Sequence, residues 1–136
     1  MSSKILGRGI LAACLASAGM PAFAGSISGS AALTSDYVFR GISQTQGDPA
    51  AQAGSKYAGD AGLYASVWGS TVEFSGDTGA SSEVDYVVGW ARALSDDWSM
   101  DVNVTYFDYP SARADLDYAE LIGTVTWRSN YWLMAG

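Results

Sequence analysis

The chain has 136 residues, of which 49% are hydrophobic, 12% aromatic and 15% charged, and its formal net charge is −7. Such a low charged fraction is unusual for a soluble domain, and the acidic balance excludes a nucleic-acid partner, which needs a basic surface. The sequence contains no histidine, which excludes Ser-His-Asp catalysis and most zinc sites. We therefore expect no enzyme and no cofactor.

The first 24 residues have the three parts of a secretory signal peptide. Lys4 and Arg8 give a positive start, and residues 9–20 are apolar and small. Residues 22–24 read Ala-Phe-Ala, which is a cleavage signature of small residues. We expect residues 1–24 to be cleaved after export, so that residues 25–136 form the mature domain.

Cys14 is the single cysteine of the sequence, so no disulfide can form within the chain. An alternative interpretation takes Leu11 to Cys14 as a lipoprotein box, with Cys14 as an acylated N-terminus. The apolar stretch before Cys14 is short and is interrupted by Arg8, which favours cleavage after Ala24 instead. Cleavage there leaves a mature chain without cysteine.

From residue 26 onward, hydrophobic residues alternate with polar ones, and this period of two predicts β-strands. The clearest segment is 98–109, where the even positions as far as Tyr106 are large and apolar and the odd positions as far as Thr105 are polar. The expected strands are 26–42, 51–58, 63–74, 83–94, 98–109 and 116–127, and residues 131–134 begin a seventh. None of them approaches the roughly 18 consecutive apolar residues of a membrane-spanning helix.

The connections between these strands are alternately long and short, and most strands have about the 9 to 11 residues that cross a bilayer when tilted. Outer-membrane barrels have short turns at one end and longer loops at the other. The sequence therefore predicts an all-β fold. More specifically, we expect an antiparallel up-and-down transmembrane β-barrel, of which this chain supplies a partial barrel of about seven strands.

Aromatic residues gather near the strand ends, as they do in the interfacial girdle of a membrane barrel. The expected girdle residues are Tyr37, Phe39, Tyr57, Trp90, Trp98, Tyr106 and Trp127. A soluble β-sandwich explains the alternation equally well. It gives no reason for loops sorted by length or for exposed rings at strand ends, so the barrel is favoured.

Most of the charged residues in the strands have the opposite parity, which predicts that they face the lumen. The expected wall residues are Asp36, Arg40, Gln52, Lys56, Glu83, Asp85, Asp101, Asn103 and Glu120. They are acidic on balance, which favours the passage of cations. The alternative is a plug of hydrogen-bonded side chains that fills a narrow barrel and conducts nothing.

The parity also predicts a register for the first two strands, because side chains of opposite charge stabilise an antiparallel pair when they lie face to face. The expected pairs are Arg40 with Gln52, Asp36 with Lys56, Phe39 with Ala53 and Ser35 with Tyr57. The acidic loops 75–83 and 113–120 have oxygen ligands but lack the ligand spacing of an EF-hand. We expect solvated charge there and no metal site.

The segment 34–44, Thr-Ser-Asp-Tyr-Val-Phe-Arg-Gly-Ile-Ser-Gln, resembles the TorF-type porin family of proteobacterial outer membranes. Further segments are similar to the same family: 52–54, 62–70, 83–85, 106–110 and 117–120. The resemblance implies an outer-membrane β-barrel that is porin-like, and it brings no catalytic residues. Family members are longer, and an odd number of strands departs from the even number of bacterial barrels, so we expect this chain to be a fragment or a truncated reading frame.

These observations lead to a functional expectation. We expect a cell outer-membrane barrel, in contact with the lipid bilayer, that allows the passive passage of small hydrophilic solutes. The alternative is a structural or partner-binding barrel whose outward loops, 43–50 and 75–82, contact a partner without conduction. A barrel hydrolase is disfavoured because the sequence has no histidine.

Overall fold

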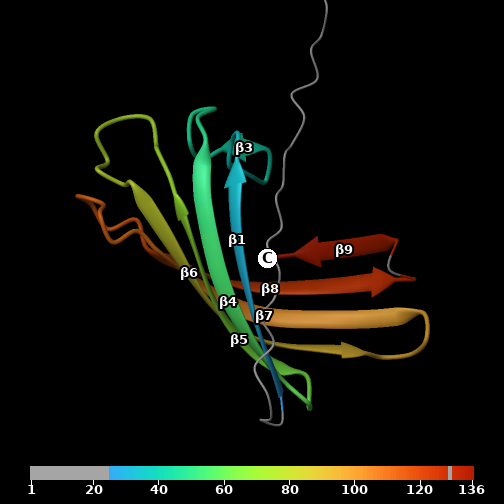
Figure 1. Ribbon diagram of the computed structural model, residues 1–136. Helices are drawn as coiled ribbons and strands as arrows, with labels where there is room; N and C mark the ends of the chain where they lie inside the picture. Colours follow the sequence, from blue (N-terminus) through green and yellow to red (C-terminus); the bar gives the residue numbers. More distant parts are fainter. Residues whose placement is uncertain (1–24, 129) are drawn as a thin grey trace, which may run out of the picture.

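The protein folds as one curved antiparallel β-sheet (Figure 1). The computed structural model describes residues 25–128 and 130–136, so the predicted signal peptide, residues 1–24, lies outside the described residues. Within the described part, seven strands form the sheet in the order β1-β4-β5-β6-β7-β8-β9. Their bounds are β1 Gly25–Thr34, β4 Ala50–Gly59, β5 Leu63–Thr71, β6 Ser82–Ala93, β7 Trp98–Asp108, β8 Tyr118–Trp127 and β9 Tyr131–Ala135. A separate hairpin consists of β2 Val38–Phe39 and β3 Ile42–Ser43.

The predicted all-β class and the antiparallel up-and-down order are confirmed, since each strand of the sheet pairs with the next one along the chain. Among the described residues, β1 and β9 form the two edges of the sheet and do not pair with each other. The sheet is therefore open and is not a closed barrel. No helix in the described ranges is long and apolar enough to cross a membrane.

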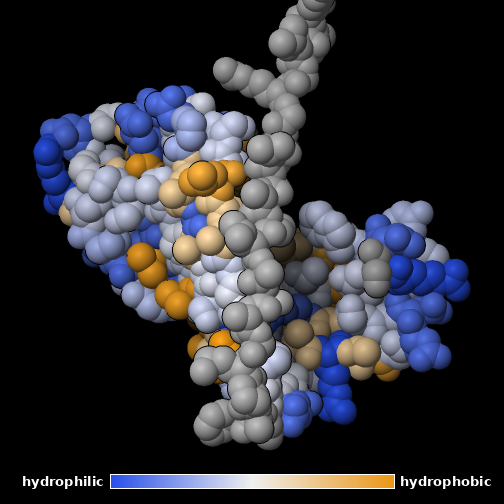
Figure 2. All heavy atoms as spheres, in the orientation of Figure 1, coloured by the Kyte–Doolittle hydropathy of each residue, from blue (hydrophilic) through white to orange (hydrophobic). Residues whose placement is uncertain are grey.

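The two ends of the sheet have connections of different length. Residues 60–62 and 94–97 make tight turns, the short connection from β8 to β9 lies at the same end, and we call this the turn end. Residues 35–49, 72–81 and 109–117 make the long loops, and we call this the long-loop end. Figure 1 shows the long loops towards the top and left and the turns towards the bottom and right. In Figure 2, hydrophilic residues gather over both ends.

The sheet has one apolar and one polar face, because residues paired across neighbouring strands project from the same side. The apolar face carries Ile27, Leu33, Leu63, Val67, Tyr86, Val88, Val102, Val104, Leu121, Val125 and Leu133. The polar face carries Gln52, Lys56, Ser66, Ser70, Glu83, Asp85, Asp101, Asn103, Thr105, Glu120 and Thr124. On the apolar face Val88 is 64% exposed and Leu121 is 65% exposed, so no other element of the described chain covers it.

A cluster of buried apolar side chains lies at the long-loop end of the sheet and does not cover the apolar face. Its buried members are Val72, Ala80, Phe107 and Tyr109, with Tyr37, Phe39, Phe74, Ala112 and Leu116 partly buried against them. All three long loops contribute to this cluster. The loops are therefore packed on one another and on the end of the polar face, which fixes their positions.

The predicted first strand, 26–42, is too long. β1 ends at Thr34, and residues 35–49, which we call the first long loop, leave the sheet. The side chain of Asp36 accepts hydrogen bonds from Ser43 Oγ and Thr45 Oγ1 at 2.6 and 3.0 Å. Local side-chain bonds of this kind compete with a strand ladder, which explains why the chain turns here although its alternation continues.

The predicted register between the first two strands is wrong. Gln52 pairs with Ala32 and not with Arg40, and Lys56 pairs with Ser28 and not with Asp36. The expected pairs of Phe39 with Ala53 and Ser35 with Tyr57 are wrong for the same reason, since Ala31 and Ile27 take those places. The hairpin turn at Arg40 and Gly41 lies within the predicted strand 26–42.

Candidate functional site

The polar face brings together seven of the nine residues predicted for the lumen wall. Gln52, Lys56, Glu83, Asp85, Asp101, Asn103 and Glu120 project from this one side of the sheet, as their cross-strand partners show. Arg40 and Asp36 are not on a strand of the sheet. Arg40 reaches the face from the first long loop, whereas Asp36 bonds to residues within that loop. That the face lines a lumen stays a prediction.

A continuous hydrogen-bond track runs along β7 on this face. Tyr64 of β5 donates its hydroxyl to the Asp101 carboxylate at 2.8 to 2.9 Å. Asn103 donates its amide to Asp101 at 2.8 Å, and Thr105 donates its hydroxyl to Asn103 at 3.0 Å. The Lys56 ammonium lies 3.8 Å from the centre of the Tyr64 ring, a cation–π distance. Acceptors and donors thus follow one another along the strand direction.

Sequence reasoning missed Tyr64 as a member of this face, because both parities of β5 are apolar. The glycine opposite gives the orientation. Gly89 pairs with Tyr64 across β5 and β6, and a Cβ at position 89 would lie 2.5 Å from the Tyr64 ring. A glycine that faces a large ring across a strand pair is the signal that could have placed Tyr64 on the polar side.

Glu83 lies beneath the long loops and is 2% exposed. It accepts a hydrogen bond from the Tyr37 hydroxyl at 2.8 Å and another from the Tyr109 hydroxyl at 2.5 Å. Burial, followed by the hydrogen bond to Glu83, raises the pKa of both phenols well above the ordinary value. Both phenols therefore keep their protons and satisfy a carboxylate that would otherwise be buried without partners.

Asp85 lies next to Glu83 on the same face and has fewer hydrogen-bond partners. Its Oδ1 atom is buried and has no hydrogen-bond partner among the described residues. Cross-strand pairing places Asp85 between Trp68 and Phe107, two side chains that offer an apolar environment. The long-loop end of the polar face therefore carries two neighbouring carboxyl groups, one fully partnered and one not.

Arg40 of the first long loop binds Glu120 of β8 through two hydrogen bonds. The guanidinium nitrogens lie 3.0 and 2.7 Å from the two carboxylate oxygens, which is the bidentate geometry of a strong charge-assisted pair. The hydrogen bond that Arg40 donates to Glu120 raises the pKa of Arg40 above its ordinary value. Arg40 also lies over the Phe39 ring at 4.9 Å. The loop is therefore attached to the far side of the polar face.

On the opposite face, five predicted girdle residues are found on the apolar side: Tyr57, Trp90, Trp98, Tyr106 and Trp127. Trp98 and Trp127 are a cross-strand pair at the turn end, with ring centroids 6.5 Å apart, and Tyr131 stacks on Trp127. Trp90 donates its indole N–H to the Ala61 carbonyl at 3.1 Å. Their position at a membrane interface stays a prediction.

The other two girdle assignments, Tyr37 and Phe39, are wrong. Both residues lie in the first long loop and pack over the polar side of the sheet. Tyr37 makes an edge contact with Trp68 at 5.4 Å, and Phe39 packs against Phe107 at 6.0 Å. The assignment depended on their belonging to the first strand, and that strand ends before them.

A comparison with protein families decides where this chain belongs. A family model described as "Bacterial protein of unknown function (Gcw_chp)" matches residues 18–133. The chain belongs to the Gcw_chp family. No curated protein and no solved structure matches it. The description of the Gcw_chp family names neither an activity nor a membrane, so the resemblance to the TorF-type porin family is unaffected by it and stays a prediction.

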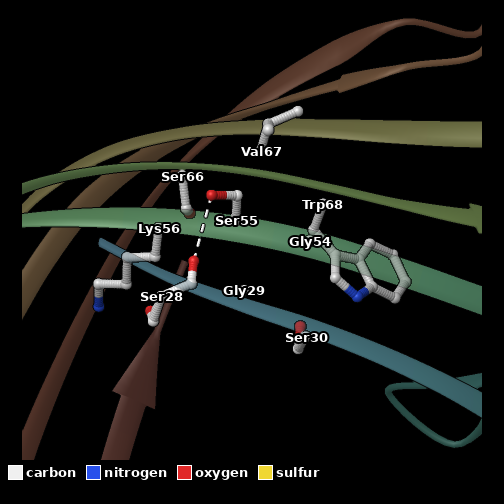
Figure 3. Close-up of a pocket in the computed structure, with 9 residues that line it drawn as sticks. All are labelled: Ser28, Gly29, Ser30, Gly54, Ser55, Lys56, Ser66, Val67 and Trp68. Carbon is white, nitrogen blue, oxygen red and sulfur yellow. Dashed lines mark hydrogen bonds between the residues drawn. The ribbon is translucent and has the colours of Figure 1, made fainter. Parts of the chain in front are cut away.

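This Gcw_chp chain also has a shallow hollow over β1, β4 and β5 (Figure 3). Glycines at positions 29 and 54 and several serines line it, and Ser55 donates its hydroxyl to the Ser28 carbonyl at 3.1 Å. In Figure 3, Lys56 and Trp68 project to one side of the strands and Val67 to the other. The described residues contain no group of three or more Cys, Asp or Glu side chains that could hold a metal ion. The hollow therefore offers serine hydroxyls and the Lys56 ammonium as hydrogen-bonding groups.

Proposed function

We propose that this chain forms an outer-membrane β-barrel, or part of one, that lets small hydrophilic solutes pass. The observation that carries the proposal is the difference between the two faces of one curved sheet. Large apolar side chains on one face are exposed, for example Leu133 at 76% and Leu63 at 60%. Water does not favour such a continuous apolar surface, whereas the hydrocarbon of a bilayer accommodates it. The polar face on the inside of the curve then faces water.

The arrangement of the ends supports the same proposal. Tight turns at one end and long loops at the other match the orientation of bacterial barrels, whose short turns face the periplasm. Along β7, Trp98 stands at the turn end of the apolar face and Tyr106 towards the long-loop end. They are eight positions apart, which is roughly 26 Å along the strand. At the tilt of about 35–45° in such barrels this distance covers roughly 20 Å of an apolar band of about 25 Å.

The charge of the polar face indicates the class of solute. Four carboxylates lie on it within the described strands: Glu83, Asp85, Asp101 and Glu120. Lys56 and the loop residue Arg40 are the cations that approach the same face. A passage with this balance favours cations and neutral polar solutes over anions. Export by residues 1–24 to the cell outer membrane belongs to the same proposal.

A second candidate is a structural barrel that conducts nothing. It is favoured by one observation: the polar side chains bond to each other, as in the track of Tyr64, Asp101, Asn103 and Thr105. Such a network fills the inside of a narrow barrel without leaving a path. The two candidates share the fold and the membrane and differ only in conduction.

Single-channel recording in planar bilayers tests the proposal with the purified mature protein. We expect discrete current steps with a preference for cations, and heat-modifiable gel migration should show first that the protein is folded. Asp101→Asn should lower the preference for cations, whereas Asp60→Asn in an exposed tight turn should leave it unchanged. A folded protein that gives no current would overturn passive transport and leave the structural barrel.

A further inference from the structure

The first long loop, residues 35–49, does not extend away from the end of the sheet. It crosses the polar face and contacts four strands in turn. Tyr37 contacts Trp68 of β5 and Glu83 of β6, Phe39 packs on Phe107 of β7, and Arg40 binds Glu120 of β8. The loop therefore spans the width of the face that is proposed to line the passage.

The loop has a defined structure of its own. Thr45, only 3% exposed, accepts a hydrogen bond from the Tyr37 backbone N–H at 3.1 Å and donates its hydroxyl to Asp36. The backbone N–H of Gln44 donates to the Tyr37 carbonyl at 2.6 Å, and the backbone N–H of Glu73 donates to the Gln44 carbonyl at 2.7 Å. These bonds hold the hairpin of β2 and β3 in place against the neighbouring long loop.

Arg40 occupies a backbone conformation that does not suit arginine. Its φ is 48° and that of Gly41 is 85°, so both central residues of this two-residue hairpin turn lie at positive φ. Turns of this kind favour Asn, Asp or Gly at the first position, because other side chains are strained there. An arginine at this place points to a role for its side chain, and that side chain is the one that reaches Glu120.

We propose that the first long loop is the constriction of the passage along the polar face, and that Arg40 sets its charge preference. This inference rests on the proposed transport function. At the narrowing, the guanidinium of Arg40 offsets the charge of Glu120, while Glu83 is covered by the Tyr37 hydroxyl and Asp85 keeps an unpartnered oxygen. The carboxylates that a cation meets at the loop are therefore paired or covered, except for the unpartnered oxygen of Asp85.

Two variants separate the mechanical role of the loop from its charge. Arg40→Asn suits the turn, so the hairpin should survive while the attachment to β8 is lost. Glu120→Gln removes the same attachment from the other side. Both should raise single-channel conductance, by roughly two-fold, because both release the loop from the far wall. Their selectivities should move in opposite directions, by roughly three-fold in the cation-to-anion permeability ratio, because one variant removes a positive and the other a negative charge.

The chain contains a matched control at the turn end. Arg128 also has a positive φ, 50°, lies 4.8 Å from the ring of the preceding Trp127, and pairs with Asp97 at 3.0 Å. Arg128→Asn therefore removes an arginine at positive φ together with its ring contact and its ion pair, away from the first long loop. We expect its conductance and selectivity to equal those of the unmodified protein.

The outcomes distinguish the constriction by the first long loop from the transport function on which it rests. Higher conductance with opposite shifts in selectivity supports the constriction. Conductance and selectivity that are the same in all four folded proteins would overturn the constriction and leave transport intact. No current from any of the four would overturn transport, and the constriction with it.

Discussion

The guanidinium of Arg40 and the carboxylate of Glu120 meet at 2.7 and 3.0 Å, although four strands, β4 to β7, separate β1 from β8 in the sheet. The loop that carries Arg40 begins directly after β1. Neighbouring strands are spaced by about 4.8 Å, so the first long loop must cross the polar face to make this contact. Tyr37 and Phe39 contact β5, β6 and β7 on the way.

A double-mutant cycle tests the strength of this pair. Arg40→Ala, Glu120→Ala and the double variant should give a favourable coupling energy, because the geometry is bidentate, but a small one, because the Arg40 side chain is 41% exposed. The measurement is urea unfolding in detergent micelles, followed by tryptophan fluorescence. A coupling energy of zero would mean that the contact does not help to hold the loop.

Glu83 should be the most sensitive carboxylate to replace. Glu83→Ala leaves the hydroxyls of Tyr37 and Tyr109 without their acceptor in a buried place, so we expect it to lower the free energy of unfolding by about 2–4 kcal/mol. Glu73→Ala, an exposed carboxylate on the neighbouring loop, should change it by less than about 0.5 kcal/mol. Equal effects of the two variants in urea unfolding would contradict the account of the Glu83 site.

The same two phenols predict a dependence of stability on pH. Free tyrosine ionises near pH 10, and the pKa values of Tyr37 and Tyr109 are raised in the folded protein. Their contribution to stability is therefore fully present below about pH 10 and is lost as the pH rises above it, because only the unfolded chain releases these protons. Replacement of both by phenylalanine should reduce the decline in unfolding free energy between pH 10 and 11 by about 2 kcal/mol, about 1 kcal/mol for each phenol. An unchanged decline would exclude the two phenols as its source.

Two glycines on opposite faces give a further test. At Gly89 an added Cβ would lie 2.5 Å from the Tyr64 ring, whereas at Gly123 nothing lies within 4 Å. Gly89→Ala should displace Tyr64 from Asp101 and cost about 2–3 kcal/mol of unfolding free energy. Gly123→Ala should be neutral or stabilise the fold by about 0.5 kcal/mol, because it restricts the unfolded chain. Similar values for both variants would show that Tyr64 is not held where the structure has it.

The alternation of apolar and polar residues was sufficient to predict most strands of the sheet. The expected segments 83–94 and 98–109 correspond to β6, Ser82–Ala93, and β7, Trp98–Asp108. Each has a clear period of two and is bounded by turn-forming residues. Because a strand's parity assigns its faces, the same pattern also grouped the seven charged and polar strand residues that the structure places together on the polar face.

The first long loop could not be predicted in this way. Its residues continue the alternation of β1, so a reading by period alone extends the strand through them. What ends the strand is the set of local bonds to Asp36 together with contacts to distant residues, such as Tyr37 with Glu83, 46 positions away. Alternation reports which residues share a side, but it does not report which strand lies opposite. The wrong register of Lys56 and the wrong girdle assignment of Phe39 have this one cause.

The central claim is that the apolar face contacts lipid and the polar face contacts water, and two adjacent valines test it most directly. Val88 is 64% exposed on the apolar face and pairs with Val104, while Val87 lies on the polar face and pairs with Thr105. Residues 25–136 contain no cysteine, so Val87→Cys and Val88→Cys can each carry one nitroxide label in liposomes. We expect the label at 88 to collide mainly with oxygen dissolved in lipid, and the label at 87 mainly with a water-soluble nickel chelate. The same preference at both positions would contradict the account.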